Sequence, residues 1–419
     1  MSGTAEDVSE SRWADSFESE YLQEYLGRIV EKLGIKGPKF CITSGSKVGD
    51  NYVGVVHRVK IEGLRNKLPV EIPTIFKISP TDEIIREVLQ VKHLFSREHE
   101  FYSEIVPVFK KFLQAHHKTL ENVPKCYFST NIEYKEAICM EDLQSEGFEM
   151  RDRIKQLDFA HAALTLRALG RFHAVSFALR DQKPEVFARK ISHIKEAVFR
   201  PEVVEHESLL ERCEILGKMV TMALADEDPR YTKRFAEFRK NVTKDFAWPF
   251  EGSNAEPYTV LNHGDLWTNN LLFKYDKDHG EPQEVYFLDF QIVRYASPAS
   301  DISYLLFCSC NQELRNRHFD ELIKIYHESL SAYLSELGSD PRKLFPYDEL
   351  LRQMRKFSTT TGIMAMLIVQ AITSQGDDVV GFGAKNEDLA GSEKRIQRDY
   401  FWRNTLRDIY KDMIDRNYI

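Results

Sequence analysis

Four polar residues in the second half of the chain have the types and the spacing that phosphate chemistry needs. His263, Asp265 and Asn270 stand in the order H-x-D-x-x-x-x-N, and Asp289 follows near the end of the apolar run Val285–Phe290. Kinase catalytic loops use this spacing for an Asp that faces the acceptor hydroxyl and an Asn that binds Mg²⁺, and a second metal-binding Asp follows on the next strand pair. One such residue alone is typical of an ordinary turn. The complete set predicts phosphoryl transfer.

This chemistry assigns a role to each side chain. Asp265 is the predicted catalytic residue, which orients the acceptor hydroxyl and accepts its proton. Asn270 and Asp289 are the predicted ligands of a Mg²⁺ ion that ATP oxygens and water also coordinate. His263 and Asp301 are expected to give structural support. The histidine braces the loop by hydrogen bonds, and the aspartate anchors loop backbone N–H groups near the start of a helix.

A lysine and a glutamate further upstream complete the set that a kinase requires. Lys77 lies in a strand-like run and is the predicted contact for the α- and β-phosphates. Lys60 lies on the preceding strand-like run and is expected on its solvated face. Glu98, on the next helix, is predicted to pair with Lys77. Glu87 and Glu100 are alternatives, because an amphipathic helix carries acids all along its polar face.

Two segments are expected to contact the nucleotide. The first is the turn Thr43–Tyr52, whose Gly45 and Gly49 would lay backbone N–H groups over the phosphates; it matches neither G-x-G-x-x-G nor Walker A, and only its place ahead of the lysine strand favours this role. The second is Glu141–Leu143, where Asp142 marks the crossing to a second lobe and backbone groups would meet adenine. Glycine hairpins and acidic turns also occur without ligands, so both interpretations stay open.

The elements that must position these residues change in type along the chain. Residues 17–33 predict a helix, and apolar periodicity predicts two more between residues 83 and 116. Strand-like runs predict an antiparallel five-stranded sheet; they cover residues 39–43, 52–61, 70–78, 125–129 and 137–140. From Leu157 onward the apolar spacing is helical. The sequence therefore predicts an α+β bilobal fold, with a disordered segment at 1–20, a nucleotide-binding lobe at 21–142 and a catalytic and substrate-binding lobe at 143–419.

Composition restricts the class of protein. The 419 residues carry a formal net charge of −8 at pH 7, which argues against a nucleic-acid partner because nucleic-acid binding favours basic surfaces. The six cysteines lack the spacing of metal sites and are expected to be reduced thiols. The polar N-terminus has no signal-peptide core, and the apolar run Gly362–Val369 is too short for a membrane span and predicts a buried helix. A cytoplasmic enzyme is therefore predicted.

Six short motifs follow one another along the chain between roughly residues 38 and 310. They are Gly45-Ser-Lys-Val-Gly-Asp-Asn-Tyr52, Glu98-His-Glu-Phe-Tyr102, Met140-Glu-Asp-Leu143, Leu169-Gly-Arg-Phe-His-Ala174, His263-Gly-Asp-Leu-Trp-Thr-Asn-Asn270 and Asp289-Phe-Gln291. In this order they resemble the arthropod ecdysteroid kinase-like family, which is close to choline and aminoglycoside kinases. The resemblance implies a protein-kinase-like fold that phosphorylates a hydroxyl of a small molecule, with ecdysteroids as the named acceptors. Gln291 stands where protein kinases have the Gly of D-F-G, and no long activation segment follows.

The sequence leaves the acceptor open. Aromatic residues make up 12% of the chain, which suits an apolar acceptor but also an ordinary core. A steroid, a hydroxylated xenobiotic and an amino alcohol of the choline type stay as alternatives. A different class of function is a catalytically silent protein that keeps the kinase fold and binds a hydrophobic hormone, and the intact Asp265, Asn270 and Asp289 count against it. Nothing in the sequence indicates an oligomeric state.

Overall fold

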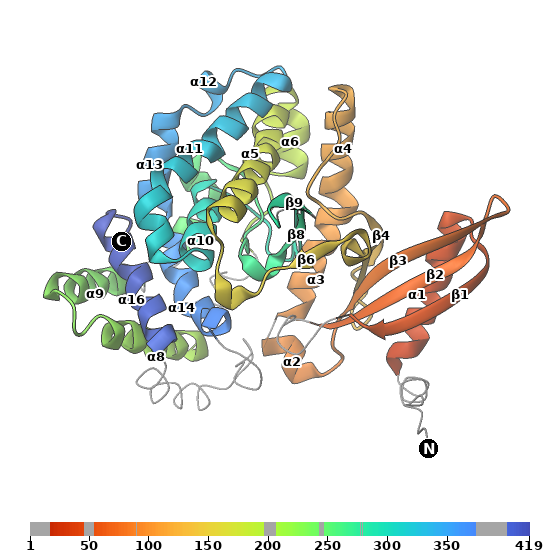
Figure 1. The fold of residues 1–419 in the computed structure, drawn as a ribbon, viewed down its shortest axis with the longest axis horizontal. Coiled ribbons are helices and arrows are strands. Elements are labelled where there is room, and N and C mark those ends of the chain that lie inside the picture. The colour runs from red at the N-terminus through yellow and green to blue at the C-terminus, as the bar shows by residue number, and fades with distance from the viewer. Residues whose placement is uncertain are drawn as a thin grey trace.

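Five antiparallel strands form the first lobe of the molecule, at the right of Figure 1. The computed structural model describes residues 17–45, 54–88, 90–196, 207–242, 247–276, 278, 280–373 and 400–419. Across the sheet the strands are ordered β1-β2-β3-β5-β4. Their bounds are β1 (Lys36–Ser44), β2 (Val55–Arg65), β3 (Leu68–Ile78), β4 (Cys126–Thr130) and β5 (Ala137–Glu141). Each predicted strand run overlaps one of these strands, so the predicted antiparallel sheet is confirmed.

Helix α1 (Phe17–Leu33) covers one face of this sheet and confirms the predicted helix. Residues 17–20 therefore belong to α1 and not to the predicted disordered segment, of which residues 1–16 lie outside the described residues. Side chains alternate between the two faces of a strand. On β2, Val59 and Ile61 are buried with α1, whereas Arg58 lines a cavity on the opposite face. That second face points towards the rest of the chain.

Helices follow β3 and lie between the sheet and the second lobe (Figure 1). They are α2 (Glu83–Val88), α3 (Val91–Glu100), the π-helical turn η1 (Phe101–Ile105) and α4 (Val106–Ala115). The two helices predicted here correspond to α2 and to the continuous stretch α3-η1-α4. The π turn was not predicted. Because a π turn contains an extra residue, it changes the direction of the side chains that follow it, and such turns are frequent at functional sites.

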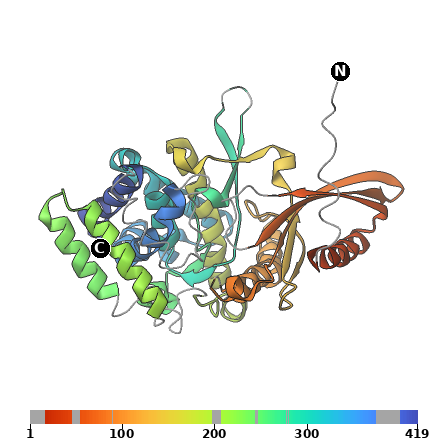
Figure 2. The same ribbon diagram turned by 90° about the horizontal axis from the view of Figure 1, so that it is seen from below.

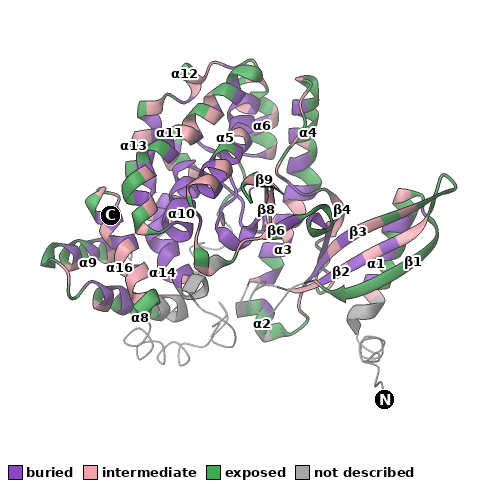
Figure 3. Ribbon diagram, in the orientation of Figure 1, coloured by how far each residue is buried: buried purple, intermediate pink, exposed green. Residues whose placement is uncertain are grey.

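The second lobe is mostly helical, as predicted. Helices α5 (Phe159–Gln182) and α11 (Gln312–Glu336) pack along each other, and α10 (Ala299–Ser309) is buried at every residue (Figure 3). The other described helices are α6 (Pro184–Lys190), α8 (Glu207–Ala223), α9 (Pro229–Val242), α12 (Pro341–Leu344), α13 (Tyr347–Phe357), α14 (Thr359–Thr373) and α16 (Tyr400–Asp415). Short 3₁₀ turns are η2 (Leu143–Glu146), η3 (Arg153–Lys155), η4 (Trp248–Phe250), η5 (Gly252–Ala255) and η6 (Thr268–Asn270).

The chain beyond the first lobe also forms two small antiparallel sheets. One has the order β6-β8-β9, formed by β6 (Phe148–Met150), β8 (Leu271–Tyr275) and β9 (Pro282–Phe287); the other pairs β7 (Val260–Asn262) with β10 (Arg294–Ala296). In Figure 2 the β8–β9 hairpin stands between the two lobes. Because β7 pairs with β10 and β8 pairs with β9, the loop from β7 to β8 and the loop from β9 to β10 start from one strand pair and end on the other. This pairing brings Asp265 and Asp289 into one region.

The predicted buried helix at 362–369 is present within α14, where Ile363, Ala365 and Val369 are buried. None of the helices in the described parts of the chain has the length and apolar character needed to cross a membrane.

Candidate active site

Helix α10 holds the loop of residues 263–270 through one carboxylate. Asp301 accepts hydrogen bonds from the backbone N–H groups of His263 and Gly264, at 2.6 and 2.9 Å. Gly264 has a φ of 89°, and a Cβ at this position would lie 2.1 Å from the carbonyl oxygen of Ile292. Only glycine allows this turn. The interpretation of the sequence missed this requirement, although the Gly between His and Asp signals it.

The imidazole of His263 connects the two loops of the site. Its Nε2 donates to the carbonyl oxygen of Leu288 at 2.9 Å, and its Nδ1 accepts the backbone N–H of Asp265 at 3.3 Å. Burial lowers the pKa of His263 below its usual value, although the charges of Asp301 and Asp289 oppose the shift. The ring is therefore neutral and uses both nitrogens inside the protein, which is the behaviour of a bracing residue.

Both oxygens of the Asp265 carboxylate accept hydrogen bonds. The amide Nδ2 of Asn270 donates to Oδ2 at 2.9 Å, and the hydroxyl of Tyr304 donates to Oδ1 at 3.0 Å. Desolvation, together with the charge of Asp289, raises the pKa of Asp265 to about 6. A carboxylate with a raised pKa is a better proton acceptor than an ordinary aspartate and is still ionised near neutral pH. Tyr304 was missed in the sequence, although it lies one helical turn after Asp301 and so on the same face of α10.

Lys77 is the centre of a buried ionic cluster. Its Nζ lies 2.9 Å from Glu98 Oε2 and 3.4 Å from Gln291 Oε1, and it also pairs with Asp289. Burial alone would lower the pKa of Lys77, but Asp289 and Glu98 outweigh it and raise this pKa above its usual value. Burial raises the pKa of Glu98, although Lys77 opposes the shift. Glu98 Oε1 has no hydrogen-bond partner within the described residues.

The rival residues of the ionic cluster lie apart from it. Lys60 pairs with Glu62 and Glu71, and its side chain is 40% exposed. Glu87 is exposed. Glu100 pairs with Arg97 at 3.1 Å. The structure therefore brings Lys77 and Glu98 together, as the sequence interpretation preferred.

Asp289 and Asn270 provide the oxygen atoms that Mg²⁺ prefers. Both line the same cavity, and the Asp289 side chain is 24% exposed. The amide nitrogen of Asn270 is used by Asp265, so its Oδ1 is the atom left for a cation. No cluster of three or more His, Cys, Asp or Glu side chains suited to a metal occurs among the described residues. These two donors therefore fit a Mg²⁺ ion that takes its other ligands from phosphate and water.

A cavity of about 490 Å³ opens between the lobes and collects most of the predicted residues. Those that line it are Gly45, Lys77, Glu98, Asp142, Asn270 and Asp289. Val56, Ile75, Met140, Leu143, Leu272 and Leu288 add apolar walls. Asp265 adjoins the cavity through its hydrogen bond with Asn270. The combination of apolar walls and a charged inner end suits a nucleotide, with the base on the walls and the phosphates near the lysine.

The hinge residue Asp142 is fully engaged within the protein. Its carboxylate accepts from Arg58 at 2.5 Å and from the backbone N–H of Gln144 at 3.1 Å, its own N–H donates to Pro73, and its carbonyl accepts from Ser145. A direct contact between Asp142 and a nucleotide stays a prediction. Its observed contacts fix the hinge to β2 and β3.

The glycine turn is only partly described. Gly45 lies at the end of β1, and a Cβ there would lie 2.6 Å from the Cγ1 atom of Val56, so β1 and β2 approach each other closely at this point. Gly49 lies outside the described residues.

Phe290 joins the two lobes behind the site. Its ring stacks on Phe101 of η1 with a centroid distance of 4.0 Å and an angle of 11°, and it lies 4.6 Å from the ring of His263. The π turn thus presents Phe101 to the Asp-Phe-Gln segment one turn after Glu98. The role of Phe290 was not predicted, although an aromatic residue directly after the metal-binding Asp is the signal that indicates it.

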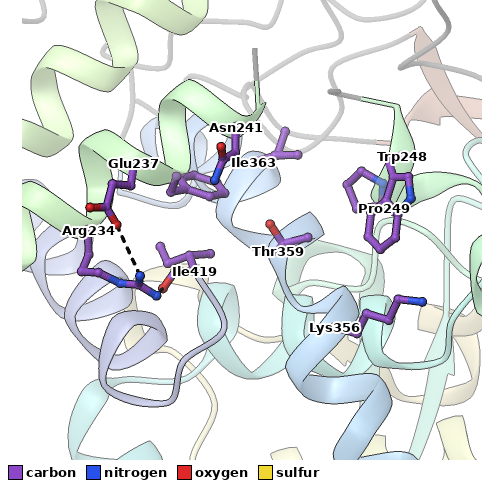
Figure 4. A pocket seen from close by; sticks show the side chains of 10 residues that line it. Arg234, Glu237, Asn241, Trp248, Pro249, Lys356, Thr359, Ile363 and Ile419 are labelled. Carbon is purple, nitrogen blue, oxygen red and sulfur yellow. Dashed lines mark hydrogen bonds and ion pairs between the residues drawn. The ribbon is translucent and has the colours of Figure 1, made fainter. Parts of the chain in front are cut away.

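A second cavity, of about 420 Å³, lies in the helical lobe among α9, α13 and α14 (Figure 4). Trp248 and Ile363 are among its apolar residues, and Arg234 and Lys356 are its cations. Both cations are partnered, Arg234 by Glu237 and Lys356 by the carbonyl oxygen of Asn254. No predicted site residue lines this cavity, so we assign it no part in the site.

Comparison with known proteins places the chain in a family. The model of the ecdysteroid kinase-like family matches residues 48–339, which include Lys77, Asp265 and Asp289. Among solved structures, the GDP complex of wild-type aminoglycoside 2'-phosphotransferase-IIIa is similar with a TM-score of 0.42 and 11% identity, covering 94% of this chain and 99% of that one. The GDP complex of a mutant of that enzyme has a TM-score of 0.40 and 12% identity, covering 89% and 97%. No relative is found among curated proteins.

Proposed function

This chain belongs to the ecdysteroid kinase-like family, and we propose that it transfers the γ-phosphate of ATP to a hydroxyl of a steroid-like or xenobiotic small molecule. The observation that carries the proposal is the convergence of Lys77, Asp289 and Asn270 on one cavity between the lobes, with Asp265 hydrogen-bonded to the same asparagine. Charge neutralisation and positioning of the acceptor are what phosphoryl transfer requires from a protein. These side chains supply both.

The proton path follows from the contacts of Asp265. One oxygen of its carboxylate orients the acceptor hydroxyl and takes up the proton as the hydroxyl oxygen bonds to the γ-phosphorus. The bond from that phosphorus to the bridging oxygen breaks, and its electron pair stays on the departing ADP. The raised pKa of Asp265, about 6, suits a group that must be ionised before the step and protonated after it.

The phosphate side of the reaction belongs to the other residues. Lys77 contacts the phosphates while Glu98 holds its ammonium group in place at 2.9 Å. Asp289 and the Oδ1 of Asn270 would hold Mg²⁺, which supplies charge neutralisation for the phosphate oxygens when bound. Gly45 and the turn that follows it would cover the phosphates. Asp301 and His263 keep the loop in the conformation that this arrangement needs.

A screen for an added phosphate tests the proposal. The protein is incubated with ATP, Mg²⁺ and one acceptor at a time from a panel of ecdysone, hydroxylated aromatic xenobiotics and choline, and products are followed by mass spectrometry. We expect phosphorylated ecdysone or xenobiotic, and no product with the Asp265→Ala variant. If phosphocholine is the sole product, the acceptor is an amino alcohol and not a steroid or xenobiotic. If no acceptor yields a product, the proposal that the protein is an enzyme is contradicted.

Thermal unfolding separates an enzyme from a silent hormone-binding protein of the same fold. A nucleotide at 100 times its Kd adds about 2.7 kcal/mol to the free energy of unfolding. We expect Mg·ATP to stabilise the wild-type protein. Stabilisation by ecdysone without any stabilisation by Mg·ATP would support the silent protein instead.

A further inference from the structure

Helix α10 contacts the loop of residues 263–270 at three places along one of its faces. Asp301 binds the backbone at the start of the loop, and the hydroxyl of Ser309 accepts the backbone N–H of Thr268 at 3.1 Å. Between them Tyr304 reaches the side chain of Asp265. The first and last contacts fix the path of the backbone. The middle contact is the one that acts on the carboxylate itself.

Tyr304 is held rigidly enough to direct this carboxylate. The residue is 2% exposed, and the residue before it, Ser303, shares a hydrogen bond of 2.6 Å with Thr361 of α14. Every residue of α10 is buried. A buried phenol on a rigid helix has few rotamers, so the position of its hydroxyl is set by packing. The hydroxyl is therefore a fixed donor to Asp265 Oδ1, 3.0 Å away.

Two donors on two oxygens determine the plane of the carboxylate. Asn270 on Oδ2 alone would leave the group able to rotate about the bond between Cβ and Cγ, because one hydrogen bond does not fix a plane. With Tyr304 on Oδ1 that rotation is blocked. A carboxylate offers about four acceptor directions, so one direction on each oxygen is left for the acceptor hydroxyl.

We propose that Tyr304 is a positioning residue, which fixes the orientation of the Asp265 carboxylate towards the acceptor hydroxyl. The proposal rests on the proposed function for its effect on rate, but the orientation itself is a property of the protein alone. A buried tyrosine needs some hydrogen-bond acceptor in any case, and many backbone carbonyls would serve. Here the acceptor is the carboxylate that takes up the proton in the proposed reaction.

The Tyr304→Phe substitution removes only the hydroxyl, and Tyr410→Phe is its matched control. Tyr410 of α16 is also buried, and its hydroxyl donates to the carbonyl oxygen of Gly362 in α14, at 2.7 Å. With ecdysone as acceptor, we expect Tyr304→Phe to lower kcat on the order of 10- to 100-fold, while the KM for Mg·ATP stays unchanged. Tyr410→Phe should keep the wild-type kcat. An unchanged kcat in Tyr304→Phe overturns the proposal.

A double-mutant cycle shows whether Tyr304 acts through Asp265. Adding Tyr304→Phe to Asp265→Ala should leave the small residual rate unchanged, because the hydroxyl then has no carboxylate to direct. A purely structural tyrosine would lower both rates by the same factor, and that result would overturn the proposal.

A crystal structure of Tyr304→Phe tests the orientation of the Asp265 carboxylate and needs no acceptor substrate. We expect the Asp265 carboxylate to rotate away from its contact with Asn270 or to occupy two orientations. If the wild-type protein phosphorylates nothing, the proposed function fails, while this structure still tests the positioning. A carboxylate that keeps its wild-type orientation in Tyr304→Phe would refute the positioning even if the enzyme is active.

Discussion

Two neighbouring parts of the site hold their carboxylates in opposite ways. The lysine corner, formed by Lys77, Glu98, Asp289 and Gln291, is ionic: one ammonium group faces two carboxylates, and Glu98 Oε1 lacks a hydrogen-bond partner within the described residues. The base corner, formed by Asp265, Asn270 and Tyr304, has neutral donors on both oxygens of a single carboxylate. The first has an excess of negative charge, and the second has one hydrogen-bond donor on each oxygen of its carboxylate.

The difference indicates which ligand completes each corner. A buried excess of negative charge is unfavourable until a cation arrives, which supports our proposal that Mg²⁺ and its phosphates bind at the lysine corner. Preorganised hydrogen bonds lose nothing at the moment of reaction, so the base corner is ready before any ligand binds. Substitutions in the lysine corner should therefore act on metal and nucleotide affinity. Substitutions in the base corner should act on the transfer step.

The largest effect is expected in the base corner. Asp265→Ala should lower the transfer rate on the order of 10²–10⁴-fold, the range typical of a lost general base, while stabilisation by Mg·ATP stays close to wild type. Steady-state kinetics and thermal unfolding with Mg·ATP measure the two quantities. Asp265→Asn is the matched control for shape, because it keeps an acceptor for Tyr304 but takes up no proton. If either variant turns over at the wild-type rate with saturating Mg·ATP, Asp265 is not the base.

Removing the charge of Asp289 tests the lysine corner. Asp289→Asn keeps the shape but removes the carboxylate that attracts a hard cation. Outer-sphere partners of metals are worth about 10- to 100-fold in metal affinity, so the loss of a direct ligand should be at least as large. Excess Mg²⁺ should restore part of the transfer rate. Asn270→Ala should weaken Mg²⁺ binding less, because it removes a neutral ligand. A Mg²⁺ titration that is unchanged in folded Asp289→Asn would exclude the metal role.

A smaller effect is expected from Glu98→Gln, which removes one of the two carboxylates that face Lys77. Without ligands Lys77 keeps Asp289, so the variant should be about as stable as wild type. In the presence of Mg·ATP the cation competes for Asp289, and Lys77 then depends on Glu98. A tenfold loss of nucleotide affinity would lower the stabilisation by about 1.4 kcal/mol at equal ligand concentration. Thermal unfolding with Mg·ATP measures this stabilisation. If Mg·ATP stabilises Glu98→Gln as much as wild type, Glu98 does not contribute to nucleotide binding.

Local spacing was enough to predict the order of the elements and most of the residues in the two corners, although neither Gln291 nor Tyr304 was among them. His263, Asp265 and Asn270 lie within one loop, and Asp289 follows the next hairpin, so the distances along the sequence already limit their positions in space. Lys77 and Glu98 were recognisable because a kinase site needs a strand lysine paired with a glutamate from a helix that follows it. The five-stranded sheet followed from five strand-like runs, although a long helical segment separates β3 from β4.

Contacts between distant segments could not be predicted in the same way. Tyr304 meets Asp265 across 39 positions, and Arg58 meets Asp142 across 84. No local pattern in the sequence records such pairings, because they depend on how whole helices and strands pack. The π turn at Phe101–Ile105 could not be predicted either, because its single extra residue leaves the apolar periodicity of the helix almost unchanged.

The smallest effect concerns the anchor below the base corner, and it is expected to disappear in acid. Burial alone would raise the pKa of Asp301, but hydrogen bonds from His173 and from the backbone of Gly264, with the nearby His263, hold this pKa below its usual value. A carboxyl with a depressed folded-state pKa stabilises the protein above its unfolded-state pKa, about 3.9, and loses that contribution as the pH falls through the folded-state value. Asp301→Asn should therefore be less stable than wild type at pH 7, and the gap should narrow below about pH 4. Urea unfolding from pH 7 to pH 3 measures this difference in the free energy of unfolding. Ser300→Ala on the same helix is the control. Because it removes no titrating group, its free energy of unfolding should change with pH in parallel with that of the wild type. A constant gap for Asp301→Asn over this range would show that the Asp301 charge does not anchor the loop.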